Sequence, residues 1–428
     1  MKELFPARDS LANKISYYHI LLFLASLPFD RFYSHVILTS FILHTIINLD
    51  KQHTRSVITL RTFILVSVFF VTILSTFYSV NKPEAYNEWI RQITILLFPI
   101  IFCFTNLDLK KYRAPLLLGF SLVITATIAY LYFDAIRTIR HYQLPFSTLF
   151  TTSFINHNFS QPIDMHATFL SMQVTMALVY LISVLVKEKG NGYKIFYSIC
   201  SVILLAGLFQ LCSKSVFFCL FITTNLAVPF FALKGNSRIN FILIAASISV
   251  VAIVALFKSN TFKERYITDL RADLTEATIG ESTESRLTRW AVVGELIVKA
   301  PIVGYGSGSE VGLLQKSFYE KKYYNSFLHK LNAHNEYLSF LLKSGIIGLL
   351  VYLLTLIAGF RMALKRKDLL FFTFMLLIAV VSTSENIFDV DKGVIFYAFF
   401  FSFFMFSSPN KSFEMYDNAE ALNELNIA

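Results

Sequence analysis

Twelve runs of about 15 to 22 mostly apolar residues constrain the fold of this 428-residue chain more than any other feature. A helix of ~20 residues is long enough to cross the ~30 Å hydrocarbon core of a bilayer. Because hydrocarbon offers no hydrogen-bond partners, each run must satisfy its own backbone N–H and C=O groups, which a helix does. Since 55% of the residues are hydrophobic, the sequence predicts an all-α polytopic membrane protein with about 12 transmembrane helices.

The chain is expected to form a single membrane domain over residues 1–428, with a long external segment at 258–336 and a cytoplasmic tail at 409–428. Residues 195–233 are too many for one crossing, so we expect a hairpin with Lys214 at its tip. The predicted spans cover residues 15–30, 33–49, 61–80, 91–106, 114–133, 166–186, 195–212, 215–233, 239–257, 337–360, 369–388 and 394–408.

Positive charge gathers in alternate loops and predicts the orientation of the chain in the membrane. Residues 361–368 carry four Lys and Arg and residues 106–113 carry three, whereas the hairpin tip carries Lys214 alone. Cytoplasmic loops hold the excess of Lys and Arg, so both termini are expected in the cytoplasm and 258–336 outside. The net charge of +10 then reflects membrane topology, and we expect contact with membrane lipids and no nucleic-acid partner.

Four cysteines lie in or beside apolar runs and form no Cys-x-x-Cys pair. They are expected to be small core residues, and no metal site or disulfide framework is indicated. The polar N-terminus shows no cleavage site before the first apolar run, so no removable signal peptide is expected.

The external segment is expected to contain short amphipathic helices. Residues 284–299 have helical spacing, place Arg286, Arg289 and Trp290 on one face, and are followed by Pro301, which ends a helix. Gly304, Gly306 and Gly308 then indicate a flexible, tight turn rather than a dinucleotide site, because no strand precedes them. The capping-box spacing from Ser307 to Glu310 predicts a second helix that runs to about Tyr319.

His334 and Asn335 stand where this polar segment enters an apolar helix. Histidine can exchange a proton near neutral pH without a large change in pKa. Placed at a membrane surface, it can act on a substrate that is held there by a lipid tail. Gly345 and Gly348 follow inside the helix, where small residues favour close packing between helices.

The stretch from His334 to Gly348 resembles the signature of the O-antigen ligase family of membrane glycosyltransferases: His-Asn, nine residues, Gly, two residues, Gly. O-antigen polymerases and protein O-oligosaccharyltransferases belong to the same superfamily. The upstream pattern of an Arg, a Trp, a Pro and a Gly-x-Gly turn is also similar, and weaker similarities occur near His166 and Glu385. Ser213-Lys214 stands where the family usually has Ser-Arg, so the charge is kept but the bidentate guanidinium is lost. The upstream match consists of Arg286, Trp290, Pro301, Gly304 and Gly306.

The resemblance implies transfer of a glycan from an undecaprenyl diphosphate carrier to a hydroxyl group, without a metal or other cofactor. His334 is then the expected general base, and Arg286, Lys214 and Arg289 the expected cations at the diphosphate. Supporting roles are open for four residues, each with a structural alternative such as packing or capping. These four are Asn335, Trp290, His166 and Glu385.

The expected acceptor is a sugar hydroxyl of lipid A-core, on the periplasmic side of the bacterial inner membrane. Polymerisation of carrier-linked repeats and transfer to Ser or Thr of proteins are alternatives, because both share the donor and leaving group. A polysaccharide transporter or flippase is the alternative from another class. Repeated halves and helices broken at the midplane would be its signs, and the sequence shows no clear internal repeat.

Overall fold

The computed structural model describes residues 9–49, 55–258, 263–268, 270–271 and 285–407, and every regular element within these ranges is helical. The helices of the first half are α1 (Leu11–Ser26), α2 (Arg31–Ile47), α3 (Leu60–Thr76), α4 (Lys82–Phe104), α5 (Leu109–His141), η2 (Phe146–Phe150), η3 (Thr152–Phe154), α6 (His157–Ser160), η4 (Gln161–Ile163), α7 (Ala167–Leu185) and α8 (Asn191–Leu211). Those of the second half are α9 (Lys214–Ile222), η5 (Thr223–Ala227), α10 (Val228–Ala232), α11 (Gly235–Lys258), η6 (Glu264–Thr268), α14 (Arg286–Lys299), α15 (Glu310–Glu320), α16 (Tyr324–Leu328), α17 (Glu336–Lys365), α18 (Leu369–Val381), η7 (Ile387–Asp389) and α19 (Asp391–Ser407).

Short polar side chains set the starts of the long apolar helices. The side chains of Ser10, Asp30, Thr59, Asn81 and Asp108 each accept a hydrogen bond from a backbone N–H in the first turn of the helix that follows. Such N-caps satisfy donors that have no partner inside the helix. Polar turns between apolar runs therefore fix where each of these helices begins.

The all-α polytopic membrane fold is confirmed. In the described residues six helices are long and apolar enough to cross a membrane, namely α4, α5, α7, α8, the continuous helix 214–232 and α17, and α3 and α18 are shorter apolar helices. Each predicted span coincides with a helix, although several ends differ.

The difference at residues 382–388 matters most, because these residues were predicted to continue a span. Instead, α18 ends at Val381, and a polar turn carries Glu385 and Asn386 out of the helix. Ser382 to Asn386 are all polar, so a helix through them would place several polar side chains in hydrocarbon. The turn that results is part of the site described below.

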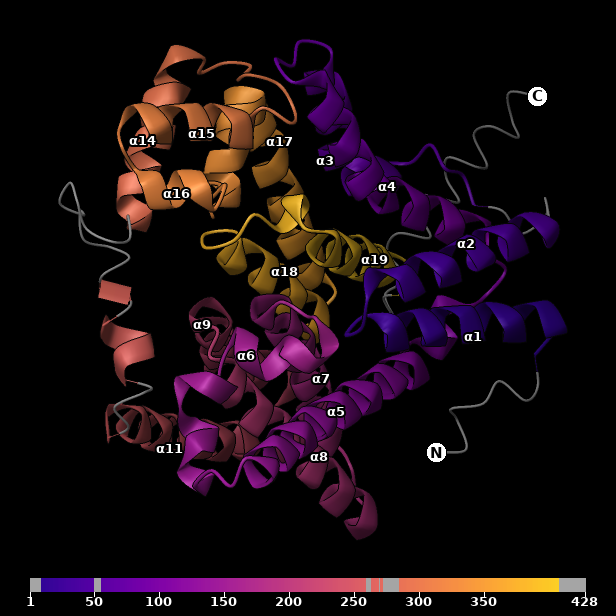
Figure 1. Ribbon diagram of the computed structural model, residues 1–428. Coiled ribbons are helices and arrows are strands. Elements are labelled where there is room, and N and C mark those ends of the chain that lie inside the picture. The colour runs from indigo at the N-terminus through magenta and orange to yellow at the C-terminus, as the bar shows by residue number, and fades with distance from the viewer. Residues whose placement is uncertain (1–8, 50–54, 259–262, 269, 272–284, 408–428) are drawn as a thin grey trace, which may run out of the picture.

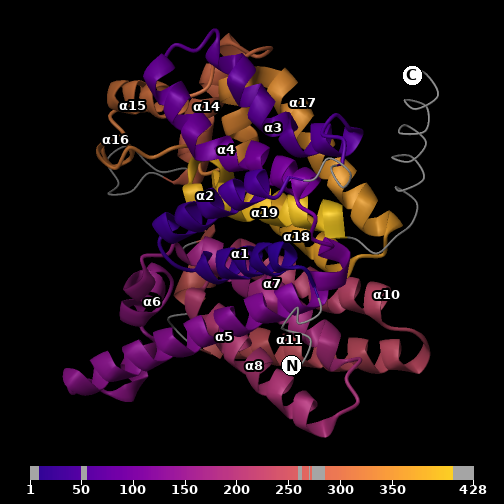
Figure 2. The same ribbon diagram turned by 90° about the vertical axis from the view of Figure 1, so that its right-hand side faces the viewer.

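The phenylalanine-rich helix α19 lies at the centre of the molecule. From Gly393 to Ser407 all of its side chains are buried, and it packs against α4, α5, α18 and α3. Figure 2 shows α19 between the helices of the first half of the chain and α18. A helix that is apolar on every side is stable in such a position, and it fixes the place of the polar turn that precedes it.

Helices α14, α15 and α16 form a small layer of their own beside the beginning of α17 (Figure 1). Its core contains Val293, Leu296, Leu314 and Phe318 together with Leu342 of α17. The predicted helix at 284–299 is confirmed over 286–299, whereas much of 258–284 lies outside the described residues. Because Leu342 belongs to both parts, the layer is attached to the membrane helix.

The glycine turn after α14 is tight, and hydrogen bonds hold its backbone in place. Gly304, Gly306 and Gly308 all have positive φ. The N–H of Tyr305 donates to the carbonyl of Leu342 at 3.0 Å, and that of Gly306 to the carbonyl of Lys343 at 2.8 Å. The expected tight turn is present, and the N–H groups of Tyr305 and Gly306 bind it to α17.

Gly345 breaks α17, with φ 61° and ψ −163°. The break frees backbone groups, and the N–H of Ile346 donates to the carbonyl of Pro301 at 2.9 Å. A Cβ on Gly345 would lie 2.1 Å from the carbonyl oxygen of Ile302. The close approach expected at this glycine is present, but the partner is the external turn rather than a neighbouring helix.

The predicted capping box at the start of the second external helix is wrong. Ser309, not Ser307, is the N-cap of α15. The hydroxyl of Ser307 donates instead to the carbonyl of Thr72 in α3 at 2.8 Å. The carboxylate of Glu310 points away from the cap and accepts a hydrogen bond from the N–H of Ala333 at 2.9 Å.

Candidate functional site

A loop that carries His334 lies between the external layer and α17. His334 has φ 45°, in the left-handed region that is costly for a residue with a side chain. Its N–H donates to Oδ1 of Asn332 at 3.0 Å. The indole N–H of Trp290 donates to the carbonyl of Ala333 at 2.8 Å, and Arg289 donates to the carbonyl of Asn332 at 3.4 Å. Two residues of α14 therefore hold the backbone before the histidine.

Asn335 fixes the backbone after the histidine. It is the N-cap of α17, and its Oδ1 accepts a hydrogen bond from the N–H of Leu338 at 3.2 Å. Its own N–H donates to Oδ1 of Asn386 at 2.8 Å. Asn335 therefore caps α17, as expected. Its contact with Asn386 joins the turn before α19 to the histidine loop.

The imidazole of His334 faces the carboxylate of Glu385. Nδ1 lies 3.5 Å from Oε2, and the side chains are 31% and 15% exposed. The hydroxyl of Thr168 donates to the other carboxylate oxygen at 3.3 Å. A carboxylate at Nδ1 favours the tautomer that carries its proton there, which leaves Nε2 as the basic nitrogen. The pair has the arrangement of a base and its orienting acid, on a histidine side chain that is partly exposed.

The charge of Glu385 is stabilised by its neighbours. Burial alone would raise the pKa of the Glu385 carboxyl, but the hydrogen bond with His334 and the electrostatic interactions with His166, His334 and Arg286 outweigh it and lower the pKa. Glu385 is therefore ionised at neutral pH, as its role beside the imidazole requires.

His166 lies beside this pair and caps α7. Its Nδ1 accepts a hydrogen bond from the N–H of Thr168 at 3.3 Å, and its ring centroid is 4.3 Å from that of His157. Burial lowers the pKa of His166 to about 4, so the ring is neutral at pH 7. The observed contacts of His166 are structural, and they hold the segment that reaches Glu385.

Two distant parts of the chain, each with a predicted cationic residue, reach the same turn. Arg286 donates to the carbonyl of Ser384 at 3.4 Å. The hydroxyl of Ser384 donates to that of Ser215 at 3.2 Å, directly after Lys214 at the start of α9. The structure therefore brings Arg286 and His334 to one turn, and Lys214 directly precedes the residue of α9 that contacts it. Arg289 is directed toward the carbonyl of Asn332, within the histidine loop.

An apolar cavity of about 520 Å³ adjoins Lys214. Helices α7, α8, α9 and α11 contribute its walls, and among the described residues that line it Lys214 is the only charged one. The lining includes Leu178, Ile182, Leu205, Phe217, Phe221 and Ile248. The cavity can accommodate a hydrocarbon chain whose charged end lies at Lys214.

Residues 166–353 match a family model described as O-antigen ligase. This region belongs to the O-antigen ligase family. It contains His166, Lys214, Arg286 and His334, whereas Glu385 lies beyond it. No curated protein matches the chain.

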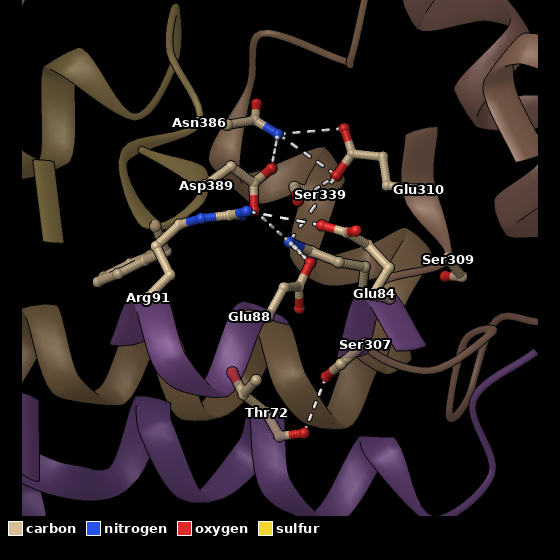
Figure 3. A network of polar contacts seen from close by, with 12 residues as sticks. Thr72, Glu84, Glu88, Arg91, Ser307, Ser309, Glu310, Ser339, Asn386 and Asp389 are labelled. Atoms are coloured by element: carbon tan, nitrogen blue, oxygen red, sulfur yellow. Dashed lines mark hydrogen bonds and ion pairs between the residues drawn. The ribbon is translucent and has the colours of Figure 1, made fainter. Parts of the chain in front are cut away.

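This O-antigen ligase family site contains buried residues that sequence reasoning missed. Glu310, Asn386, Asp389 and Lys343 form a network that contacts the histidine loop, and Figure 3 shows Glu310, Asn386 and Asp389 within it. The one signal for it in the sequence is a lysine within an apolar run, because an ionisable residue inside a membrane helix requires a partner. In the part of the chain that the structure describes, no group of three or more His, Cys, Asp or Glu side chains could hold a metal ion.

Proposed function

We propose that this membrane glycosyltransferase of O-antigen ligase or polymerase type acts as a ligase. In this proposal it transfers a glycan from undecaprenyl diphosphate to a sugar hydroxyl of lipid A-core. The observation that carries the proposal is the meeting of a His–Glu pair with cationic residues at one turn, where His334 lies 3.5 Å from Glu385 and Arg286 binds the neighbouring carbonyl.

The donor side of the proposal is supported by the position of Lys214. A lipid diphosphate combines a long hydrocarbon chain with a doubly charged head. Lys214 lines the apolar cavity and precedes Ser215, which contacts the turn at Ser384. The hydrocarbon chain of the lipid would occupy the cavity. Lys214 and Arg286 would hold its diphosphate near Glu385.

The proposed transfer is a displacement at the anomeric carbon. The acceptor hydroxyl gives its proton to Nε2 of His334 as its oxygen attacks this carbon. The bond between the carbon and the diphosphate oxygen breaks, and its electron pair stays on the diphosphate. Glu385 stabilises the imidazolium that forms, and the cations stabilise the charge that grows on the leaving group.

The rest of the proposal concerns placement. We infer that the protein lies in the bacterial inner membrane, with residues 258–336 and the site in the periplasm and residues 409–428 in the cytoplasm. The alternation of Lys and Arg between loops supports this orientation. The whole of residues 1–428 would act as a single membrane domain.

Polymerase and protein O-oligosaccharyltransferase activities remain alternatives, because they differ in the acceptor. A transporter is less well supported. The break in α17 lies at Gly345, in the first third of a helix that runs from Glu336 to Lys365, and the cationic residues meet at helix ends rather than in the middle of a helix.

Transfer by purified protein tests the proposal. Carrier-linked glycan would be incubated with core lipid, with carrier-linked repeat, or with a Ser/Thr protein. We expect product with core lipid, and we expect His334→Ala to lower the rate by at least about 10²-fold, as loss of a general base does. The matched control is His329→Ala, which removes an exposed histidine of the same external segment. Near-normal transfer by the His334 variant, or product with another acceptor alone, would refute the ligase mechanism.

A further inference from the structure

The backbone on both sides of His334 is held by one buried polar network, of which Figure 3 shows Glu310, Asn386 and Asp389. Before the histidine, the N–H of Ala333 donates to Oε1 of Glu310 at 2.9 Å. After it, the N–H of Asn335 donates to Oδ1 of Asn386 at 2.8 Å. These contacts come from separate elements, α15 and the turn before α19.

Asn386 links the two contacts to each other. Its amide nitrogen donates to Oε1 of Glu310 at 3.1 Å and to Oδ2 of Asp389 at 2.8 Å. With two carboxylates on the nitrogen side, the amide has one favourable orientation, and its oxygen must face the N–H of Asn335. Glu310 also accepts a short hydrogen bond from the hydroxyl of Ser339.

A buried lysine lies among the carboxylates of this network and pairs with them. Nζ of Lys343 lies 2.8 Å from Asp389, 3.3 Å from Glu88 and 3.9 Å from Glu310. Glu310 and Asn386 are 2% and 3% exposed. Burial, and next the negative charge of Asp389, raise the pKa of Glu310. Buried polar groups of this kind are costly unless every one is satisfied, so a complete network of them holds a single geometry.

The site has two requirements that this network meets. His334 needs support in its left-handed conformation, which is strained for a residue with a side chain. Its partner Glu385 directly precedes Asn386 in the chain, so the residue that holds the N–H of Asn335 also fixes the position of that carboxylate.

We propose that Glu310 and Asn386 are positioning residues, which set the distance and direction between the imidazole of His334 and the carboxylate of Glu385. They contact neither reacting group and act through the backbone. The expected effect of these residues on kcat rests on the proposed transfer function. Their expected effect on the position of the His334 imidazole does not.

The kinetic test compares Glu310→Leu with the conservative Glu310→Gln. Glutamine keeps an oxygen for the N–H of Ala333 and a donor for Ser339, whereas leucine removes both. We expect Glu310→Leu to lower kcat by about 10²-fold with a small change in the KM for carrier-linked glycan, because a displacement of ~1 Å has an effect of this size. Glu310→Gln should recover most of the kcat.

A second readout follows the histidine without any reaction. Protein labelled with ¹⁵N-histidine in detergent gives imidazole NMR signals, and His334→Gln assigns the signal of His334. We expect Glu310→Leu and Asn386→Leu each to shift this signal. The control is Asp368→Asn, which removes the carboxylate that pairs with Arg113 at 2.6 Å, beyond the opposite end of α17. It should leave the His334 signal in place.

The outcomes are distinct. A shifted signal in both leucine variants, with the native position kept in Glu310→Gln and Asp368→Asn, supports positioning even if the native protein transfers no glycan. An unshifted His334 signal in folded Glu310→Leu and Asn386→Leu overturns the inference, whatever the activity of the native protein. Equal loss of kcat in the glutamine and leucine variants would also overturn it.

Discussion

The carboxylate of Glu385 makes the two ring nitrogens of His334 unequal. It lies 3.5 Å from Nδ1 and is held on its other oxygen by Thr168. A ring with one nitrogen directed to a carboxylate has a defined tautomer and orientation, and its other nitrogen is the base. The residue that completes the pair is therefore as important for the proposed chemistry as the histidine.

We predict that Glu385→Gln lowers kcat for glycan transfer by about 10²-fold or more. Glutamine keeps the size but can present its amide group to Nδ1, which favours the unproductive tautomer. The measurement is the initial rate of transfer by purified protein at several donor concentrations. Glu295→Gln serves as the control, because Glu295 forms an exposed pair with Lys321. If the Glu385 variant retains full activity, the proposed tautomer control is wrong.

At the scale of the element, the break in α17 joins the membrane helix to the external layer. The carbonyls of Leu342 and Lys343 accept hydrogen bonds from the glycine turn, and Ile346 donates back to Pro301. The first part of α17 is therefore bound to the same backbone that ends α14. The histidine loop, which lies between the external layer and α17, is therefore fixed at both of its ends.

We predict that Gly345→Ala destabilises the protein by about 3 kcal/mol or more, since both a positive φ and an overlap with Ile302 oppose the methyl group. Gly294→Ala in α14 is the matched control. Its added methyl has open space, and alanine favours a helix by about 1 kcal/mol.

Thermal unfolding in detergent measures this difference. The four cysteines are buried, so a thiol-reactive dye reports their exposure on unfolding. The midpoint should fall by several degrees for Gly345→Ala and stay the same or rise for Gly294→Ala. Equal midpoints would show that the break in α17 needs no glycine.

At the scale of the whole molecule, the sequence is enough to predict the membrane helices and much less of the site. Apolar runs and capping residues determine where helices begin, so each predicted span has a helix. His334, Arg286 and Lys214 each stand at or just before the start of a helix, and the predicted topology places all three on the same side of the membrane. The contacts of Glu310 and Asn386 join residues 23 to 76 positions apart, and no local pattern indicates such pairs. The wrong prediction of a capping box at Ser307 has the same cause. The side chains of Ser307 and Glu310 form hydrogen bonds with residues that are distant in sequence.

Topology is the property of the whole molecule that is easiest to test. We predict that a cysteine at Lys214→Cys reacts with a membrane-impermeant maleimide added to the periplasmic side of intact cells. Lys187→Cys, in the exposed turn between α7 and α8, should react after the inner membrane is permeabilised. The native cysteines are buried and give little background. The reverse pattern would place the candidate site on the cytoplasmic side.

The interruption of α17 also bears on how the protein responds to its lipids. Bilayers differ in thickness, and spanning helices adapt by tilting. The segment of α17 beyond Gly345 packs against α3 and α18, and we expect it to change its tilt together with them, while the outer segment stays with α14 and α15. A change in lipid composition would then alter the slope of these helices and leave the geometry of the histidine loop unchanged.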